Sequence, residues 1–209
     1  MNRNIMTWNV RGAGRYGEHK LRILSECIEH YNPIIILLQD AGCEDDNVYI
    51  KTLLHKSYEV YDVVAGNTER YRLITAVKVP DISVMTNHGR IEYDSTYRND
   101  PGARRPLLLD CLYNQVRFHL YNVYNITNQQ KSKQEIIDLY TYVQHDGAAN
   151  RIVAGDFNLT STLLSLNIQG YETKRNNLDY VTSTFTLQNS HHILSPSDHE
   201  ILICEVDFR

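Results

Sequence analysis

The sequence predicts a four-layered α/β sandwich, in which two mostly antiparallel β-sheets pack face to face and helices flank them. Many short segments rich in β-branched and aromatic residues are spread along the chain, whereas few segments carry the apolar repeat of an amphipathic helix. Strands that outnumber helices in this way favour layered sheets with helices on the outside. The 209 residues show no repeat and no linker-like stretch, so we expect a single domain over residues 1–209.

The expected elements follow in order along the chain. Residues 4–10 alternate like a strand, and residues 20–31 place apolar side chains at helical spacing until Asn32-Pro33, where a helix should end. Residues 34–38 form a continuous apolar run that is typical of a buried strand. A second helix is expected over residues 131–143, followed by a strand at 152–154. The remaining strands are expected at 59–64, 73–79, 82–85, 107–112, 116–124, 178–181, 185–187 and 201–206.

Composition limits the classes of protein to be considered. The chain is 42% hydrophobic and 22% charged, which is ordinary for a folded soluble protein. Its longest strongly apolar run, residues 34–38, is far shorter than the roughly 20 residues that span a bilayer. Strand-like sequence begins within a few residues of Met1 and leaves no room for a signal peptide, so we expect a cytoplasmic protein or one delivered into a target cell. The four cysteines are isolated from one another, which predicts free thiols.

Charge is distributed unevenly. A formal net charge of −4 disfavours a protein that coats nucleic acid indiscriminately, because such binding relies on Lys and Arg to neutralise phosphates. Four arginines nevertheless lie close together with few acids among them, at Arg98, Arg104, Arg105 and Arg117. An enzyme that grips a few phosphates locally is therefore compatible with this composition.

Four short polar motifs each close or follow an apolar, strand-like run. They are Thr7-Trp8-Asn9, Gln39-Asp40, Gly155-Asp156-Phe157-Asn158 and Ser197-Asp198-His199. Taken singly, each has an ordinary structural explanation as a turn, a helix cap or a loop. Taken together at strand ends, they can converge on one cleft. Hydrolysis of a phosphodiester needs a cation on the phosphoryl oxygens, a base for the attacking water and donors for the developing charge, and these residue types supply all three.

Oxygen ligands for a metal are present among these motifs. Asp40, Asn9 and Asp198 offer the carboxylate and amide oxygens that Mg²⁺ prefers, and Mn²⁺ is an acceptable substitute. The sequence shows no cluster of cysteines and histidines that would compete for zinc, and the eight histidines other than His199 are expected to be ordinary surface or core residues. The sequence therefore predicts a magnesium-dependent phosphodiesterase.

In this order the motifs resemble the endonuclease/exonuclease/phosphatase superfamily, whose fold is DNase I-like, over nearly the whole chain. Within it, two branches share further segments with this sequence. Gln39-Asp40-Ala41-Gly42 and Arg105-Pro106-Leu107 resemble the active subunit of the cytolethal distending toxins, whereas Asn122-Val123-Tyr124-Asn125 resembles apurinic-site and retrotransposon endonucleases. The resemblance implies Mg²⁺-dependent hydrolysis of a phosphodiester or a phosphomonoester.

Roles can be assigned to individual residues. His199 is expected to contact the scissile phosphate, and by resemblance it is held by Asp179 of Leu178-Asp179-Tyr180. Asp156 would orient or deprotonate the attacking water, and Asn158 would donate to the phosphate from the same side of an extended segment. By resemblance, Tyr124 would stabilise the transition state through its hydroxyl.

The sequence departs from the resemblance at several positions. The metal-binding acid is ordinarily Glu, and Asp40 is shorter by one methylene. Where the toxin branch has a histidine in the middle strand, this chain offers Asn122 or Tyr124. Arg70 and Arg105 match phosphate- or DNA-binding arginines of that branch only loosely, and an exposed strand-end arginine explains each equally well.

Three functions follow as hypotheses. The leading one is an endonuclease that nicks DNA with little sequence preference, with delivery or binding subunits as partners if it acts as a toxin. The alternative is a phosphatase for inositol phospholipids or a small phosphomonoester. The third is a catalytically impaired relative that acts only as a binding module, in which Asp40 in place of the usual Glu reflects the loss of metal-dependent catalysis.

Overall fold

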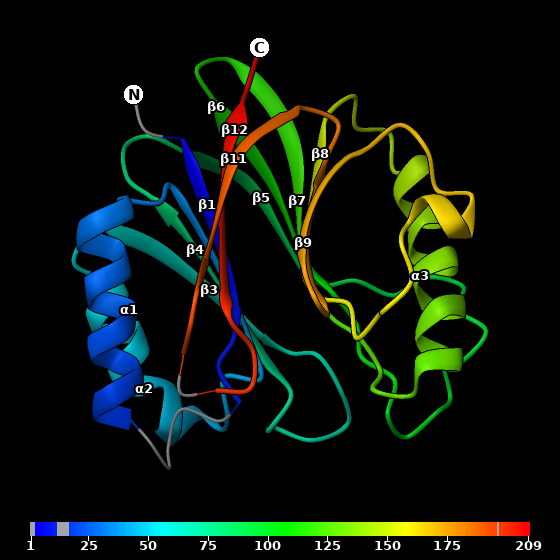
Figure 1. Ribbon diagram of the computed structural model, residues 1–209, viewed down its shortest axis with the longest axis horizontal. Coiled ribbons are helices and arrows are strands. Elements are labelled where there is room, and N and C mark those ends of the chain that lie inside the picture. The colour runs from blue at the N-terminus through cyan, green and yellow to red at the C-terminus, as the bar shows by residue number, and fades with distance from the viewer. Residues whose placement is uncertain (1–2, 12–16, 196) are drawn as a thin grey trace.

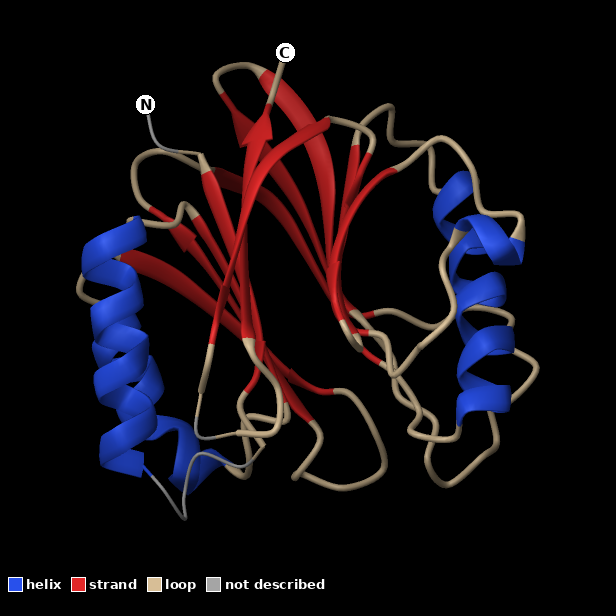
Figure 2. Cartoon of the chain, in the orientation of Figure 1, coloured by secondary structure: helices blue, strands red, loops and turns tan. Residues whose placement is uncertain are grey.

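Two six-stranded β-sheets pack against each other, and helices cover their outer faces (Figures 1 and 2). The structure is a computed structural model that describes residues 3–11, 17–195 and 197–209. The first sheet has the order β11-β12-β1-β2-β4-β3, from strands Thr186–Ile193, Ile201–Asp207, Asn4–Asn9, Ile35–Gln39, Arg72–Lys78 and Tyr58–Val64. The second has the order β5-β6-β7-β8-β10-β9, from strands Ser83–Arg90, Leu107–Tyr113, Val116–Tyr124, Arg151–Asp156, Asp179–Ser183 and Glu172–Asn176. The predicted four-layered sandwich is confirmed.

Both sheets are mostly antiparallel, as predicted. Within the described strands, each sheet has one parallel pair, β1 with β2 and β7 with β8. A helix joins the two strands of each pair, α1 (Gly17–Tyr31) in the first sheet and α3 (Gln129–Gln144) in the second. Because the strands of a pair run in the same direction, their carboxyl ends meet at the same edge.

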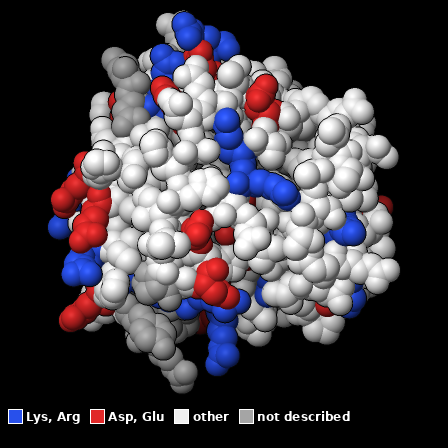
Figure 3. Space-filling model, viewed as in Figure 1, with Lys and Arg blue, Asp and Glu red and all other residues white. Residues whose placement is uncertain are grey.

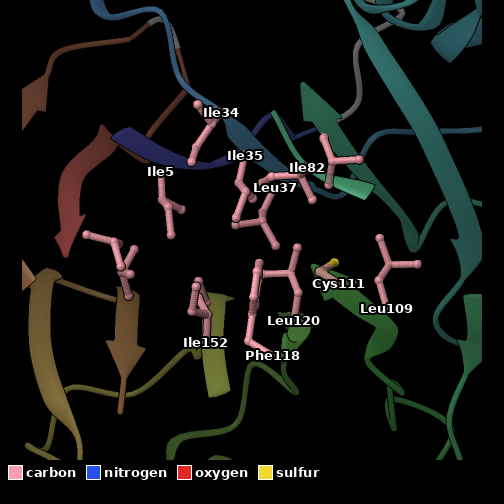
Figure 4. Close-up of a cluster of buried hydrophobic side chains, with 14 of the residues drawn as sticks. Ile5, Ile34, Ile35, Leu37, Ile82, Leu109, Cys111, Phe118, Leu120 and Ile152 are labelled. Carbon is pink, nitrogen blue, oxygen red and sulfur yellow. The ribbon is translucent and has the colours of Figure 1, made fainter. Parts of the chain in front are cut away.

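Three apolar layers hold the sandwich together. Figure 4 shows the central layer, where Ile5 and Leu37 of the first sheet face Phe118, Leu120 and Ile152 of the second. A second layer lies between the first sheet and the helices α1 and α2 (Glu44–Leu54), and a third lies between the second sheet and α3. Because strand side chains alternate between these layers, β1, β2 and β8 are buried on both faces along almost their whole length.

Some elements were not predicted from the sequence. Helix α2 (Glu44–Leu54) buries Asn47, Ile50 and Leu54, so a polar residue interrupts its apolar stripe, and its N-cap residue Cys43 makes no side-chain cap hydrogen bond. Strand β9 is polar throughout and forms because it pairs with β10 at the sheet edge. Strands β5 and β11 are also longer and more exposed than expected.

Two of the compositional predictions can be compared with the structure. None of the four cysteines, all of which lie in the described part of the chain, takes part in a disulfide. Among the described residues, no helix has both the length and the apolar character needed to cross a membrane.

Candidate active site

The carboxyl ends of the two parallel strand pairs meet across the interface between the sheets. Asn9 ends β1 and donates from Nδ2 to the Oδ2 of Asp156, which ends β8, over 2.7 Å. Strand β10 runs antiparallel to β8 and places Asp179 directly opposite Asp156. The motifs that close β1 and β8 are therefore brought together, although 147 positions separate them in the sequence.

His199 completes this cluster from the loop before β12. The Ser197 hydroxyl accepts from the His199 backbone N–H over 2.9 Å and lies 3.1 Å from the carbonyl oxygen of Asn9, which fixes the loop against the end of β1. The His199 Nδ1 lies 2.8 Å from the Oδ2 of Asp179, and its Nε2 lies 3.8 Å from the Oδ2 of Asp156. The second distance is too long for a hydrogen bond, so Nε2 stays available to a substrate oxygen.

The ionisable side chains of this cluster are almost completely buried, which strengthens the interactions between their charges. His199 is 6% exposed, and Asp156 and Asp179 are each 1% exposed. Burial disfavours the charged imidazolium, but the hydrogen bond to Asp179 and the charges of Asp179, Asp156 and Asp198 outweigh it and raise the pKa of His199. Burial also raises the pKa of Asp179. We place the proton of this pair on His199, because three carboxylates act on its imidazole.

Asp156 is fixed by three N–H donors. Its carboxylate accepts from Asn9, from the backbone N–H of Asn158 over 2.8 Å and from the Asn158 Nδ2 over 3.1 Å. Burial raises the pKa of Asp156, against the opposing charge of His199 and the hydrogen bond from Asn9. A fixed carboxylate with a raised pKa is suited to take a proton from water.

The turn after β8 differs from the extended segment that the sequence suggested. Asn158 has a left-handed backbone with φ of 47°, and its amide nitrogen also donates to the carbonyl oxygen of Asn125 over 2.9 Å. Both amide hydrogens of Asn158 are thus engaged within the protein, and the residue orients Asp156. The preceding Gly155 has φ of 139°, and a Cβ at this position would lie 1.9 Å from the carbonyl oxygen of Val123. Only glycine allows β7 and β8 to approach this closely.

The three expected metal ligands lie at this edge but face different partners. Asn9 and Asp40 lie at the ends of the adjacent parallel strands β1 and β2, and the Asn9 Oδ1 accepts from the backbone N–H of Arg11 over 3.0 Å. Asp198 pairs instead with Arg11, whose Nη1 lies 2.5 Å from its Oδ2. The charges of Asp40 and Asp198 both act on Lys20, whose ammonium donates to the backbone of Arg11.

This donor set fits a hydrated Mg²⁺. Asp40 and Asn9 offer hard oxygens from adjacent strand ends, and Mg²⁺ keeps several waters and needs only one or two protein carboxylates. Burial raises the pKa of Asp40, against the neighbouring Tyr124 hydroxyl and the charge of Arg104, which both favour the charged carboxylate. Tyr124 accordingly lies beside the proposed metal ligand.

Arg104 is the cation that sequence reasoning missed. Its guanidinium carbon lies 3.8 Å from the ring centroid of Tyr124 and 4.2 Å from that of Tyr71, and its charge acts on Asp40 and Asp156. The signal available in the sequence was its place in the arginine cluster. Its neighbour Arg105 points away, because its Nε lies 3.1 Å from Glu92 and its Nη1 lies 3.3 Å from the buried Glu135.

Two further predicted site residues, Asn122 and Arg70, lie in contrasting surroundings. Asn122 is fully buried below the site, where its Nδ2 donates to the backbone of Ile74 over 2.9 Å and its Oδ1 accepts from Gln39 over 2.9 Å. Asn122 and Arg105 are thus held by buried partners, and the contacts with a substrate predicted for them stay predictions. Arg70 is exposed just before β4 and forms no ion pair with a described residue.

Comparisons with known proteins agree with this architecture. D. rerio TDP2, solved with a single strand DNA product, superposes with a TM-score of 0.78 and 15% identity over 98% of both chains. An endonuclease/exonuclease/phosphatase from Bacteroides vulgatus gives 0.76 and 10% identity over 98% of both chains. A family protein from Leptotrichia buccalis gives 0.74 and 16% identity over 98% of this chain and 99% of that one. At these identities the likeness establishes the fold alone.

Sequence comparison adds the family. No curated protein sequence matches this chain. The sequence profile of the Endonuclease/Exonuclease/phosphatase family, however, matches residues 6–199, a span that begins in β1 and ends at His199. Because this match covers most of the chain and every residue of the cluster described above, the protein belongs to the Endonuclease/Exonuclease/phosphatase family and is an enzyme that hydrolyses phosphoesters.

Proposed function

We propose that this enzyme is a nuclease that cleaves phosphodiester bonds in DNA, with little sequence preference and with Mg²⁺ or Mn²⁺ as its metal. The observation that carries the proposal is the buried trio of Asp156, Asp179 and His199 beside the oxygen donors Asn9 and Asp40. The D. rerio TDP2 structure, which contains a single strand DNA product, supports DNA as the class of substrate.

Asp156 and His199 would have different roles in the hydrolysis. Asp156, held by Asn9 and Asn158, would orient the attacking water and take its proton. His199, kept protonated by Asp179, would donate from Nε2 to a phosphoryl oxygen as negative charge builds there. The metal, when held by Asp40 and Asn9, would supply Lewis-acid stabilisation of the phosphoryl oxygens.

Two cations would assist binding of the substrate. The buried Arg104 packs against the rings of Tyr71 and Tyr124, and its positive charge acts on the site. Arg70 is exposed near the strand end and is suited to a flanking phosphate. Such local contacts agree with the surface in Figure 3, where Lys and Arg side chains lie in separate patches on the face shown.

Nicking of supercoiled plasmid in the presence of Mg²⁺ tests the proposal. The wild type should convert supercoiled to open circles, and Asp156→Asn and His199→Ala should abolish this conversion. His191→Ala is the matched control, because His191 is exposed on β11 and should leave nicking unchanged. Equal nicking by wild type and His199→Ala would refute the proposal, since the activity would then come from a contaminant or another site.

A phosphomonoesterase is the second candidate. The net charge of −4 and the separate basic patches in Figure 3 suit a small phosphorylated substrate at least as well as a long polyanion. Phosphate release from a panel of phosphoinositides and inositol phosphates, together with intact plasmid, would favour this candidate over the nuclease. The delivery subunits that the toxin resemblance implies stay a prediction.

A further inference from the structure

A second cluster of metal-ligating side chains lies on the outer face of the second sheet. His88 on β5, Asp110 on β6 and His119 on β7 each offer one ligand atom, and these atoms lie within 4.8 Å of one another. We infer that His88, Asp110 and His119 form a separate site for Zn²⁺ or a similar divalent transition metal. The mechanism proposed above uses none of these residues.

The strand register explains how the three residues meet. Asp110 and His119 are directly paired across the antiparallel strands β6 and β7, so their side chains emerge on the same face as neighbours. His88 lies where the pairing of β5 with β6 shifts between Asn87 and Gly89. Such a bulge inserts an extra residue and redirects its side chain, and Gly89, with φ of 67°, supplies the left-handed backbone beside it. The bulge thus adds the third ligand.

A carboxylate behind His119 prepares this imidazole for a metal. The His119 Nδ1 lies 2.7 Å from the Oδ2 of Asp146, which is itself held by the Arg151 Nη2 over 2.8 Å. The Tyr121 hydroxyl also contacts Asp146. A histidine that donates one ring nitrogen to a carboxylate presents the other to a metal, and this second partner fixes the ring orientation. The Nε2 of His119 is therefore the nitrogen that a metal would take.

Arg117 is the one cation in direct contact with the cluster among the described residues. It forms a bidentate pair with Asp110, in which Nε lies 2.9 Å from Oδ1 and Nη2 contacts Oδ2, and its side chain is 70% exposed. A carboxylate has about four acceptor positions on its two oxygens, so this pair leaves each oxygen of Asp110 a further position for a metal. An exposed arginine can also swing into solvent at low cost.

The ligand types favour zinc over magnesium. Two imidazoles and one carboxylate match the nitrogen and oxygen donors of zinc sites, whereas Mg²⁺ prefers oxygen alone. His88 is exposed, so water can complete a four-coordinate site. The site is also distinct from the catalytic cluster: His119 lies five residues before Tyr124 on β7, about 16 Å away at roughly 3.3 Å per residue.

Metal content provides a test that does not depend on activity. Each protein is stripped with a chelator, equilibrated with micromolar ZnSO₄, desalted and analysed for zinc by mass spectrometry. The measurement is made in a His199→Ala background, which removes the imidazole of the catalytic cluster. We expect about one zinc per chain in this background and loss of that zinc when His88→Ala or His119→Ala is added. His191→Ala, which removes an exposed strand histidine elsewhere, should retain the zinc.

Cobalt gives an independent readout. Co²⁺ bound by two imidazoles, a carboxylate and water should produce visible d–d absorption bands, and His88→Ala should remove them. His88 is exposed, so this variant should keep the fold even if His119→Ala, which loses the contact with Asp146, does not. Zinc content that stays the same in His88→Ala, or no retained zinc in the His199→Ala background, would overturn the proposal. Neither outcome depends on whether the enzyme cleaves DNA.

Discussion

Replacing Asp179 by Asn tests the central pair of the proposed mechanism. The Asn oxygen can still accept from the His199 Nδ1, so the change removes the charge and keeps the shape. The hydrogen bond is 2.8 Å long and both partners are buried, and a charge-assisted bond of this kind contributes about 1.5 to 3 kcal/mol. If that contribution is realised in the transition state, the turnover rate should fall about 10- to 150-fold.

The pH dependence separates this role from a merely structural one. Burial opposes the imidazolium, but the neighbouring carboxylates raise the pKa of His199, so the protonated form persists above its ordinary range. Activity that needs this form is present at lower pH and is lost as the pH rises through the raised pKa. Without the Asp179 charge, the alkaline limb of the pH–rate profile should move to lower pH.

The assay should use a small chromogenic phosphodiester with Mn²⁺, so that DNA binding does not enter the measured rate. Rates are measured across the pH range for the wild type, for Asp179→Asn and for Asp81→Asn, an exposed acid whose loss should change nothing. Thermal unfolding of each protein shows that the variants are folded. An Asp179→Asn profile with an unmoved alkaline limb and an unchanged turnover rate would mean that Asp179 only supports the fold.

Three further variants test the remaining assignments. Asn122→Ala removes the buried hydrogen bonds that Asn122 makes with Gln39 and with the backbone of Ile74, and it should cost about 3 kcal/mol in urea unfolding. The activity of the folded fraction should stay within about tenfold of wild type, and lost activity at full stability would make Asn122 catalytic instead. Asp40→Glu should tighten Mg²⁺ in a metal titration of activity, because the longer side chain reaches further, and an unchanged midpoint would show that the protein already compensates. Arg104→Gln should lower kcat/KM by about 10- to 100-fold. Arg105→Gln removes the ion-pair partner of the buried Glu135 and should mainly lower the unfolding temperature. Equal losses of kcat/KM in the two variants would contradict these separate roles.

The fold could be predicted where apolar periodicity is strong. The apolar pattern is clear in helices α1 and α3 and in the buried strands β1, β2 and β8. The three strands end in the first three polar motifs. Helix α2 and strand β9 were missed because tertiary contacts, not local pattern, stabilise them. A polar edge strand such as β9 has no apolar alternation to detect.

Only the site residues that lie at or near strand ends could be predicted from the sequence. The motifs place Asn9, Asp156 and His199 at one edge, because the end of a buried strand can be read from the sequence. The choice between Arg104 and Arg105 could not be read, since it depends on rings at Tyr71 and Tyr124 that come from other strands. Adjacent residues can point to opposite faces, so only the packed structure decides which arginine reaches the site.

The same limit applies to the second cluster. In the sequence, 31 positions separate His88 from His119, and neither histidine belongs to a spacing typical of zinc ligands. Their proximity depends on the pairing of three strands and on one bulge. A register shift of one residue in β5 would turn His88 to the opposite face of the sheet, away from Asp110 and His119.

The proposed catalytic cluster depends on the packing of the two sheets in a way that no single strand reveals. The two sheets share one topology, since β11-β12-β1-β2-β4-β3 and β5-β6-β7-β8-β10-β9 place their parallel pair at equivalent positions. The first sheet supplies Asn9 and Asp40, and the second supplies Tyr124 and Asp156. A hydrogen bond crosses the interface from Asn9 to Asp156, and the Tyr124 hydroxyl lies beside the Asp40 carboxylate. Each sheet therefore holds the reacting groups of the other in place, so a substitution that shifts the sheets relative to each other should impair catalysis without touching any site residue.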